Sequence, residues 1–85
     1  MTTRLLLLHG ALGASDIFAP LVPLLRDHFE VHTLDFEGHG KNPLPLRPFR
    51  IEHFAENARD YLTNNKLGGV NIFGYSMGGY VACLL

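Results

Sequence analysis

A serine stands between two glycines in the stretch Gly74-Tyr75-Ser76-Met77-Gly78. A free serine hydroxyl is a weak nucleophile, so catalysis requires that it be exposed, next to a base and close to N–H groups that stabilise an oxyanion. A sharp turn from a strand into a helix exposes the serine, and it brings the main chain so close two residues before and after that only glycine fits. We therefore predict that Ser76 is a nucleophile on such a turn, with Met77 N–H facing the developing negative charge.

Two further stretches carry residue types that suit a functional site. These are His9-Gly10 and the turn from Asp35 to Gly40, and each directly follows a short apolar run, as the serine turn does. We interpret His9, His39 and Asp35 as residues that hold loop backbone by hydrogen bonding rather than as residues that act on a substrate.

The three apolar runs must position these residues. They span Leu5–Leu8, Val31–Leu34 and Val70–Phe73. Runs of this length that are apolar throughout, rather than alternating, are typical of strands buried on both faces of a parallel sheet. The sequence therefore predicts three such strands.

Helical patterns separate the predicted strands. The first is expected to be capped by Ser15 or Asp16 and to become regular near Pro23. The second ends at Asn64-Asn65, and its apolar residues recur at helical spacing: Ile51, Phe54, Ala55, Ala58, Tyr61 and Leu62. The resulting βαβαβα order predicts an α/β fold, a three-layer parallel sheet with right-handed crossovers. Ligands of such sheets bind at the carboxyl ends of the strands, which is where the three functional stretches lie.

Three motifs, in this order, resemble those of the α/β-hydrolase fold family, in its compact esterase and lyase-like branch. They are LLLLHGALG, similar to the strand and oxyanion loop, TLDFEGHGKN, similar to the turn after the next strand, and VNIFGYSMGGYVA, similar to the nucleophile elbow. The resemblance covers the whole chain and implies that the strands lie in the order second, first, third. Glu37 and Asn42 depart from the usual motif on a surface turn, and we give these departures little weight.

The resemblance also implies a role for individual residues. Ser76 would be the nucleophile, and the N–H groups of Ala11 and Met77 would form the oxyanion hole. Supporting residues of the loop and elbow would be His9, Gly10, Gly74 and Gly78. Candidate pocket-lining residues are Leu12, Phe36 and Tyr75.

In this family the catalytic residues follow the order serine, acid, histidine along the chain, but the nine residues after Ser76 contain neither an acid nor a histidine. We therefore expect residues 1–85 to be the N-terminal part of a single α/β-hydrolase domain, truncated in the helix after the elbow. The parent would cleave an ester or related acyl bond of a small molecule through an acyl-enzyme, and the 85 residues alone would be inactive.

Two alternatives remain open. One is a lyase-like, carbon–carbon bond-cleaving member of the same fold. The other is a non-catalytic remnant or interaction module, and an isolated chain of this kind is expected to associate or aggregate through exposed sheet edges.

The composition of the chain limits the classes of partner, cofactor and metal that are expected. The chain is 47% hydrophobic and 18% charged, with a net charge of -1, so neither nucleic acid nor a membrane is predicted as a partner. A single cysteine, Cys83, suits a reducing cytoplasm. No nucleotide-binding glycine pattern is present and no cofactor is predicted. No metal site is predicted either, because a helix ends and a strand begins between His28 and His32, so these two histidines would not share a face.

Overall fold

The structure is a computed structural model that describes residues 3–85. Strands and helices alternate along it, in the order that the apolar runs and the helical patterns of the sequence predict. The elements are β1 (Thr3–Leu8), a 3₁₀ helix η1 (Ser15–Phe18), α1 (Val22–Leu25), β2 (Phe29–Thr33), α2 (Ile51–Asn64), β3 (Asn71–Gly74) and α3 (Met77–Cys83).

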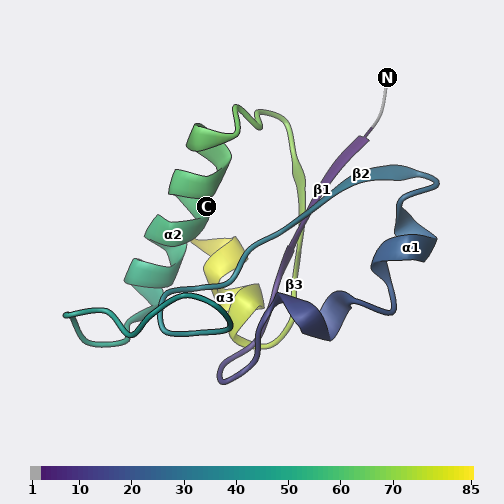
Figure 1. Ribbon diagram of the computed structural model, residues 1–85. Helices are drawn as coiled ribbons and strands as arrows, with labels where there is room; N and C mark the ends of the chain where they lie inside the picture. The colour runs from purple at the N-terminus through teal and green to yellow at the C-terminus, as the bar shows by residue number, and fades with distance from the viewer. Residues whose placement is uncertain (1–2) are drawn as a thin grey trace.

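The strands form one parallel sheet in the order β2-β1-β3. Figure 1 shows α2 and α3 together on one side of the strands and α1 on the other, which makes three layers. The predicted fold class and strand order are confirmed. Leu7 pairs with Thr33 of β2 on one side and with Phe73 of β3 on the other, so the carboxyl ends of the strands meet at one edge.

The central strand β1 is the buried centre of the sheet. Leu6 and Leu8 are fully buried and belong to the core cluster with α2 and α3, while Leu7, on the opposite face, is 2% exposed. The prediction that all three strands are buried on both faces is wrong for β2 and β3. Each has a single neighbouring strand in the described residues, and Phe73 of β3 is half exposed.

The segment between β1 and β2 departs from the predicted cap. Ala14 occupies the N-cap of η1, and no side chain caps the helix. The Ser15 N–H instead donates to Asp35 Oδ1 over 2.7 Å, because a carboxylate across the sheet edge takes the place of a local cap. The regular turn of α1 begins at Val22 with Pro23 in its first turn, as predicted.

Helix α2 closes the core from one side. Its apolar stripe places Phe54, Ala55 and Ala58 in full contact with the sheet and α3, and its charged residues face outward. The aromatic ring of Phe36 packs 5.3 Å from that of Phe54, centroid to centroid, so the chain that leaves β2 is joined to the same core.

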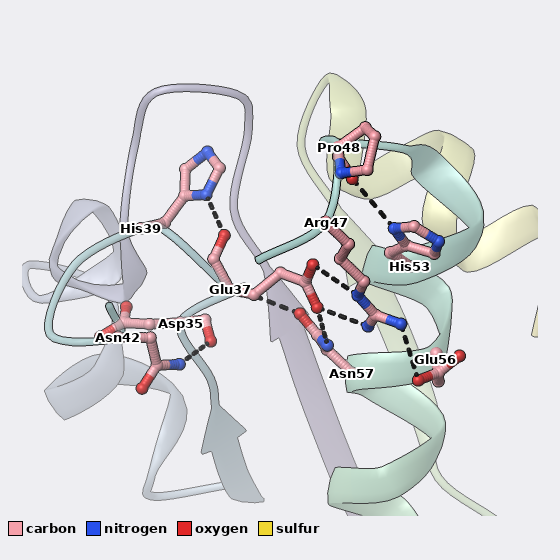
Figure 2. A network of polar contacts seen from close by, with 9 residues as sticks. All are labelled: Asp35, Glu37, His39, Asn42, Arg47, Pro48, His53, Glu56 and Asn57. Carbon is pink, nitrogen blue, oxygen red and sulfur yellow. Dashed lines mark hydrogen bonds and ion pairs between the residues drawn. The ribbon is translucent and has the colours of Figure 1, made fainter. Parts of the chain in front are cut away.

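A polar cluster fastens the loop between β2 and α2 to the first half of α2 (Figure 2). Arg47 donates to both oxygens of the Glu37 carboxylate, with Nη2 at 2.6 Å and Nε at 3.0 Å. Asn57 of α2 donates to Glu37 Oε1 over 2.9 Å and accepts the Glu37 N–H over 2.8 Å. Arg47 also reaches Glu56. These bonds hold the pKa of Glu37 below its ordinary value, with the hydrogen bond from Arg47 as the largest cause.

No helix within residues 3–85 combines the length and the apolar character that crossing a membrane requires.

We predict that Asn57→Ala lowers the free energy of unfolding by about 1–3 kcal/mol, because it leaves the half-buried Glu37 N–H without its acceptor. The measurement is urea denaturation of the protein expressed from its complete coding sequence. Asp60→Ala, on the exposed face of the same helix, is the matched control and should change the free energy by less than about 0.5 kcal/mol. Equal effects of the two substitutions would contradict the role given to Asn57.

Candidate active site

The turn between β3 and α3 holds Ser76 in a strained backbone conformation. Its φ of 55° and ψ of -115° lie in a region that non-glycine residues rarely adopt, at a cost of about 1–3 kcal/mol. A serine at a helix N-cap usually accepts a hydrogen bond from the first turn, but the Ser76 side chain makes no such bond to α3. The residue is also exposed, so its hydroxyl lies at the surface without a bond to α3.

Two glycines allow the turn to close. A Cβ at Gly74 would collide with the carbonyl group of Gly78, and a Cβ at Gly78 would collide with the Leu8 carbonyl at the end of β1. Glycine is therefore required at both positions by close approach of the backbone. Helix α3 begins directly against the end of the central strand as a result.

The loop after β1 (residues 9–13, the β1 loop) lies against this turn. The Tyr75 N–H donates to the Leu8 carbonyl over 3.0 Å. A Cβ at Gly10 would lie 3.3 Å from the Tyr75 carbonyl oxygen and 3.4 Å from Ser76 Cβ. The next residue, Ala11, is exposed. Within residues 3–85, neither the Ala11 N–H nor the Met77 N–H donates to a protein acceptor, so both groups are free to bind an anionic atom.

The buried ring of His9 ties the β1 loop to the chain after β2. Its Nε2 accepts the Phe36 N–H over 3.1 Å, so Nδ1 carries the proton and donates to the Gly10 carbonyl over 2.7 Å. Burial lowers the pKa of His9, and the nearby His39 lowers it further, against the opposing effects of the Gly10 carbonyl, Asp35 and Asp16. The neutral imidazole is therefore the form that the fold stabilises.

His39 makes the same kind of bond, and it joins the chain after β2 back to the β1 loop. Its Nε2 accepts the Leu12 N–H over 3.1 Å, and its Nδ1 lies 3.0 Å from the Glu37 carbonyl (Figure 2). The His9 and His39 rings are 5.2 Å apart, centroid to centroid. Each histidine thus holds a backbone N–H of the segment to which the other belongs.

Asp35 adds a third connection between the same segments. Its carboxylate accepts the N–H groups of Ser15, at 2.7 Å, and Lys41, at 3.3 Å. Burial by itself would raise the pKa of Asp35, but these hydrogen bonds outweigh it and hold the pKa below its ordinary value. Gly40, with φ of 55°, leaves room for the carboxylate, since a Cβ there would run into it.

The candidate pocket residues fall into two groups. Leu12, which is 95% exposed, and Tyr75, which precedes Ser76 in the chain and is 54% exposed, lie at the surface. Phe36 is fully buried between His9 and Phe54, and further chain packed on this surface would not expose it. The prediction that Phe36 lines a pocket is therefore wrong, because its ring belongs to the core.

No group of three His, Cys, Asp or Glu side chains within residues 3–85 is placed to hold a metal ion. Both ring nitrogens of His32 lie against protein groups, Tyr61 Oη at 3.0 Å and Glu30 Oε2 at 2.6 Å. The cross-segment bonds of His39, Asp35 and Glu37 were the part of the site that periodicity did not reveal. The only sequence signal for them is the presence of polar residues at strand ends.

Several known proteins resemble this chain in sequence and in fold. A sequence profile of the family described as "alpha/beta hydrolase fold" matches residues 3–85. A probable alcohol acetyltransferase from Wickerhamomyces anomalus is 32% identical over 82 residues, which are 94% of this chain and 24% of that protein. A pimeloyl-[acyl-carrier protein] methyl ester esterase from Xylella fastidiosa is 43% identical over 49 residues, which are 58% of this chain and 19% of that protein.

A solved structure of a marine microorganism esterase superposes on this chain with a TM-score of 0.91 and 32% sequence identity. The match covers 99% of this chain and 32% of the esterase. The chain therefore spans between 19% and 32% of the length of these three proteins.

We predict that Gly74→Ala lowers the free energy of unfolding by about 1–3 kcal/mol, because the added methyl group overlaps backbone of α3. Gly68→Ala is the matched control, since a Cβ there meets nothing within 4 Å, and its effect should stay within about 0.5 kcal/mol. Chemical denaturation of both variants of the protein from its complete coding sequence measures the difference. A Gly74→Ala protein as stable as the control would refute the close approach.

A second prediction concerns pH. Because the pKa of His9 is lowered in the fold, the unfolded chain binds the proton first as pH falls below about 6.5, and the free energy of unfolding decreases from there to the folded pKa. The loss attributable to His9 is at most about 1.4 kcal/mol per pH unit. Denaturation at pH 7.5, 6.5 and 5.5 should show a shallower dependence in His9→Gln than in the wild type. His28→Gln, at an exposed histidine, is the control, and equal slopes in all three proteins would contradict the prediction.

Proposed function

This chain belongs to the alpha/beta hydrolase family, and from that premise we propose that Ser76 is the nucleophile of a hydrolase that cleaves an ester or related acyl bond of a small molecule. The observation that carries the proposal is the exposed hydroxyl of Ser76 on a strained turn, beside two N–H groups that have no acceptor within residues 3–85. Residues in strained backbone conformations are concentrated at active sites.

In the proposed reaction, Ser76 Oγ attacks the carbonyl carbon of the substrate, and the hydroxyl proton passes to a histidine base. The carbonyl oxygen becomes an oxyanion and accepts hydrogen bonds from Ala11 N–H and Met77 N–H. The C–O bond to the leaving alcohol then breaks, the histidine returns its proton to the alcohol, and the acyl group remains on Ser76.

Neither His9 nor His39 suits the role of base. Each ring nitrogen of both residues lies within hydrogen-bond distance of a backbone group, so no lone pair is left for the Ser76 proton. The order serine, acid, histidine along the chain of this family places the base and its orienting carboxylate after Ser76, so the proposal takes both from outside residues 1–85. We expect no turnover from residues 1–85 by themselves.

Either water or an alcohol could accept the acyl group from Ser76. Water would complete hydrolysis, which the described function of the Xylella fastidiosa esterase favours. An alcohol would complete acyl transfer, and the similarity to a probable alcohol acetyltransferase favours this second candidate. A lyase-like member of the fold would use the same residues without a lasting acyl-enzyme.

We expect a fluorophosphonate probe to phosphonylate Ser76 in the protein expressed from its complete coding sequence, because an activated serine displaces fluoride from phosphorus. Tandem mass spectrometry of the tryptic peptide gives the modified residue. Ser76→Ala should lose labelling, whereas Ser15→Ala, at the other serine of this sequence, should retain it.

A folded wild-type protein that stays unlabelled at Ser76 would refute the serine-nucleophile mechanism. Rapid release of the alcohol, before steady turnover of a chromogenic ester, would indicate the acyl-enzyme. Added alcohol that diverts the acyl group into a new ester would identify the transferase. Turnover of a β-dicarbonyl or hydroxy-acid substrate with negligible ester hydrolysis would favour the lyase-like reaction.

A further inference from the structure

Residues 10–13 of the β1 loop are held in a conformation that their own side chains do not stabilise, since the side chain that stabilises this loop is His9 at its start. Gly13 N–H donates to the Gly10 carbonyl over 3.2 Å, which closes a four-residue turn. Leu12 occupies the third position with φ of 61°, where glycine is the usual residue and leucine is strained. The Leu12 side chain is 95% exposed, so packing contributes almost nothing to this conformation.

The Leu12 backbone has one partner outside its own loop. Its N–H donates to His39 Nε2 over 3.1 Å, and the His39 ring is 6% exposed. The bond is partly buried on the His39 side, so fewer water molecules compete for it than for a fully exposed bond. This bond therefore opposes the relaxation of Leu12 toward negative φ.

The His39 ring is itself fixed in position. Its Nδ1–H donates to the Glu37 carbonyl over 3.0 Å, which leaves Nε2 as the acceptor. Glu37 is bound to α2 through Asn57 and to the following loop through Arg47 (Figure 2). The Phe49 and Phe54 rings flank His39 at 5.6 and 5.5 Å between centroids. The acceptor that holds Leu12 is therefore anchored to a core helix.

Ala11 N–H lies one residue before Leu12 in the same turn, and within residues 3–85 it donates to no protein acceptor. We propose that His39 is a positioning residue, which fixes the direction of Ala11 N–H by holding Leu12 N–H on its Nε2 atom. The inference rests on the proposed function, in which Ala11 N–H binds the oxyanion. His39 touches neither substrate nor Ser76 and acts through the β1 loop alone.

The test compares two amide replacements of His39 in the protein from its complete coding sequence. The oxygen of glutamine reaches the position of Nε2 and keeps an acceptor for Leu12 N–H, whereas the amide of asparagine reaches only the position of Nδ1 and keeps the bond to Glu37. We expect His39→Asn to lower kcat for ester turnover by about 10–100-fold with KM within about threefold, since loss of a complete oxyanion donor costs about 10²–10³-fold. His39→Gln should stay within about fivefold of the wild-type kcat.

A purely structural role for His39 would lower kcat only through loss of folded protein. The concentration of folded enzyme is therefore measured by titration of Ser76 with the fluorophosphonate probe, and kcat is expressed per labelled site. Equal values of kcat for the two variants would overturn the inference, and so would an effect confined to KM.

Nuclear magnetic resonance of the wild-type protein supplies a readout that needs no variant. A scalar coupling across the hydrogen bond between the Leu12 amide nitrogen and His39 Nε2 is expected, and its absence would overturn the inference even where His39→Asn fails to fold. Failure of the proposed function is distinguishable, because it would appear as a wild-type protein without turnover or labelling at Ser76. In contrast, a labelled and active wild type with unchanged kcat in His39→Asn would remove only the role of His39.

Discussion

The close approach of three backbone segments at the carboxyl edge of the sheet is the constraint on which the site depends. Gly78 of α3 lies against the Leu8 carbonyl, and Gly74 lies against Gly78. Side chains at either position would push α3 away from β1. With both contacts made, the chain must turn within the three residues between Gly74 and Gly78, and Ser76 adopts the strained conformation that such a turn imposes.

Polar contacts, together with aromatic packing, join the loops around this edge. The core cluster ends at Leu8 and Phe36, where the strands give way to loops. Beyond that point, His9 and His39 bind backbone N–H groups of each other's segments, and Asp35 binds Ser15 N–H. Among residues 3–85 no buried side-chain nitrogen or oxygen lacks a hydrogen-bond partner, so this arrangement satisfies the groups that the fold removes from water.

The sequence predicted the elements and the serine turn well, because both depend on local patterns. A continuous apolar run located β1, helical periodicity located α2, the glycines that flank Ser76 located the corner, and the family resemblance supplied the strand order. The contacts of Glu37 with Asn57, and of Ser15 with Asp35, join residues that are twenty positions apart. A period of 2.0 or 3.6 residues shows which face of an element is apolar, but it does not show which single polar residue meets another across the sheet edge. For the same reason the sequence suggests Phe36, in the turn Asp35–Gly40, as a pocket-lining residue, although its ring belongs to the core.

The use of histidine as a structural acceptor separates two tasks that the same side chain type performs in serine hydrolases. An imidazole nitrogen that accepts a backbone N–H has its lone pair occupied, and it would have to release that N–H before taking a proton from Ser76. Burial lowers the pKa of His9 further and so weakens it as a base. The ring nitrogens Nε2 of His9 and His39 instead accept N–H groups of loop backbone. In the proposed mechanism, residues 1–85 therefore contribute the nucleophile and the oxyanion donors, held in place by these hydrogen bonds. The proton is transferred by a different histidine, whose ring nitrogen is free to face Ser76.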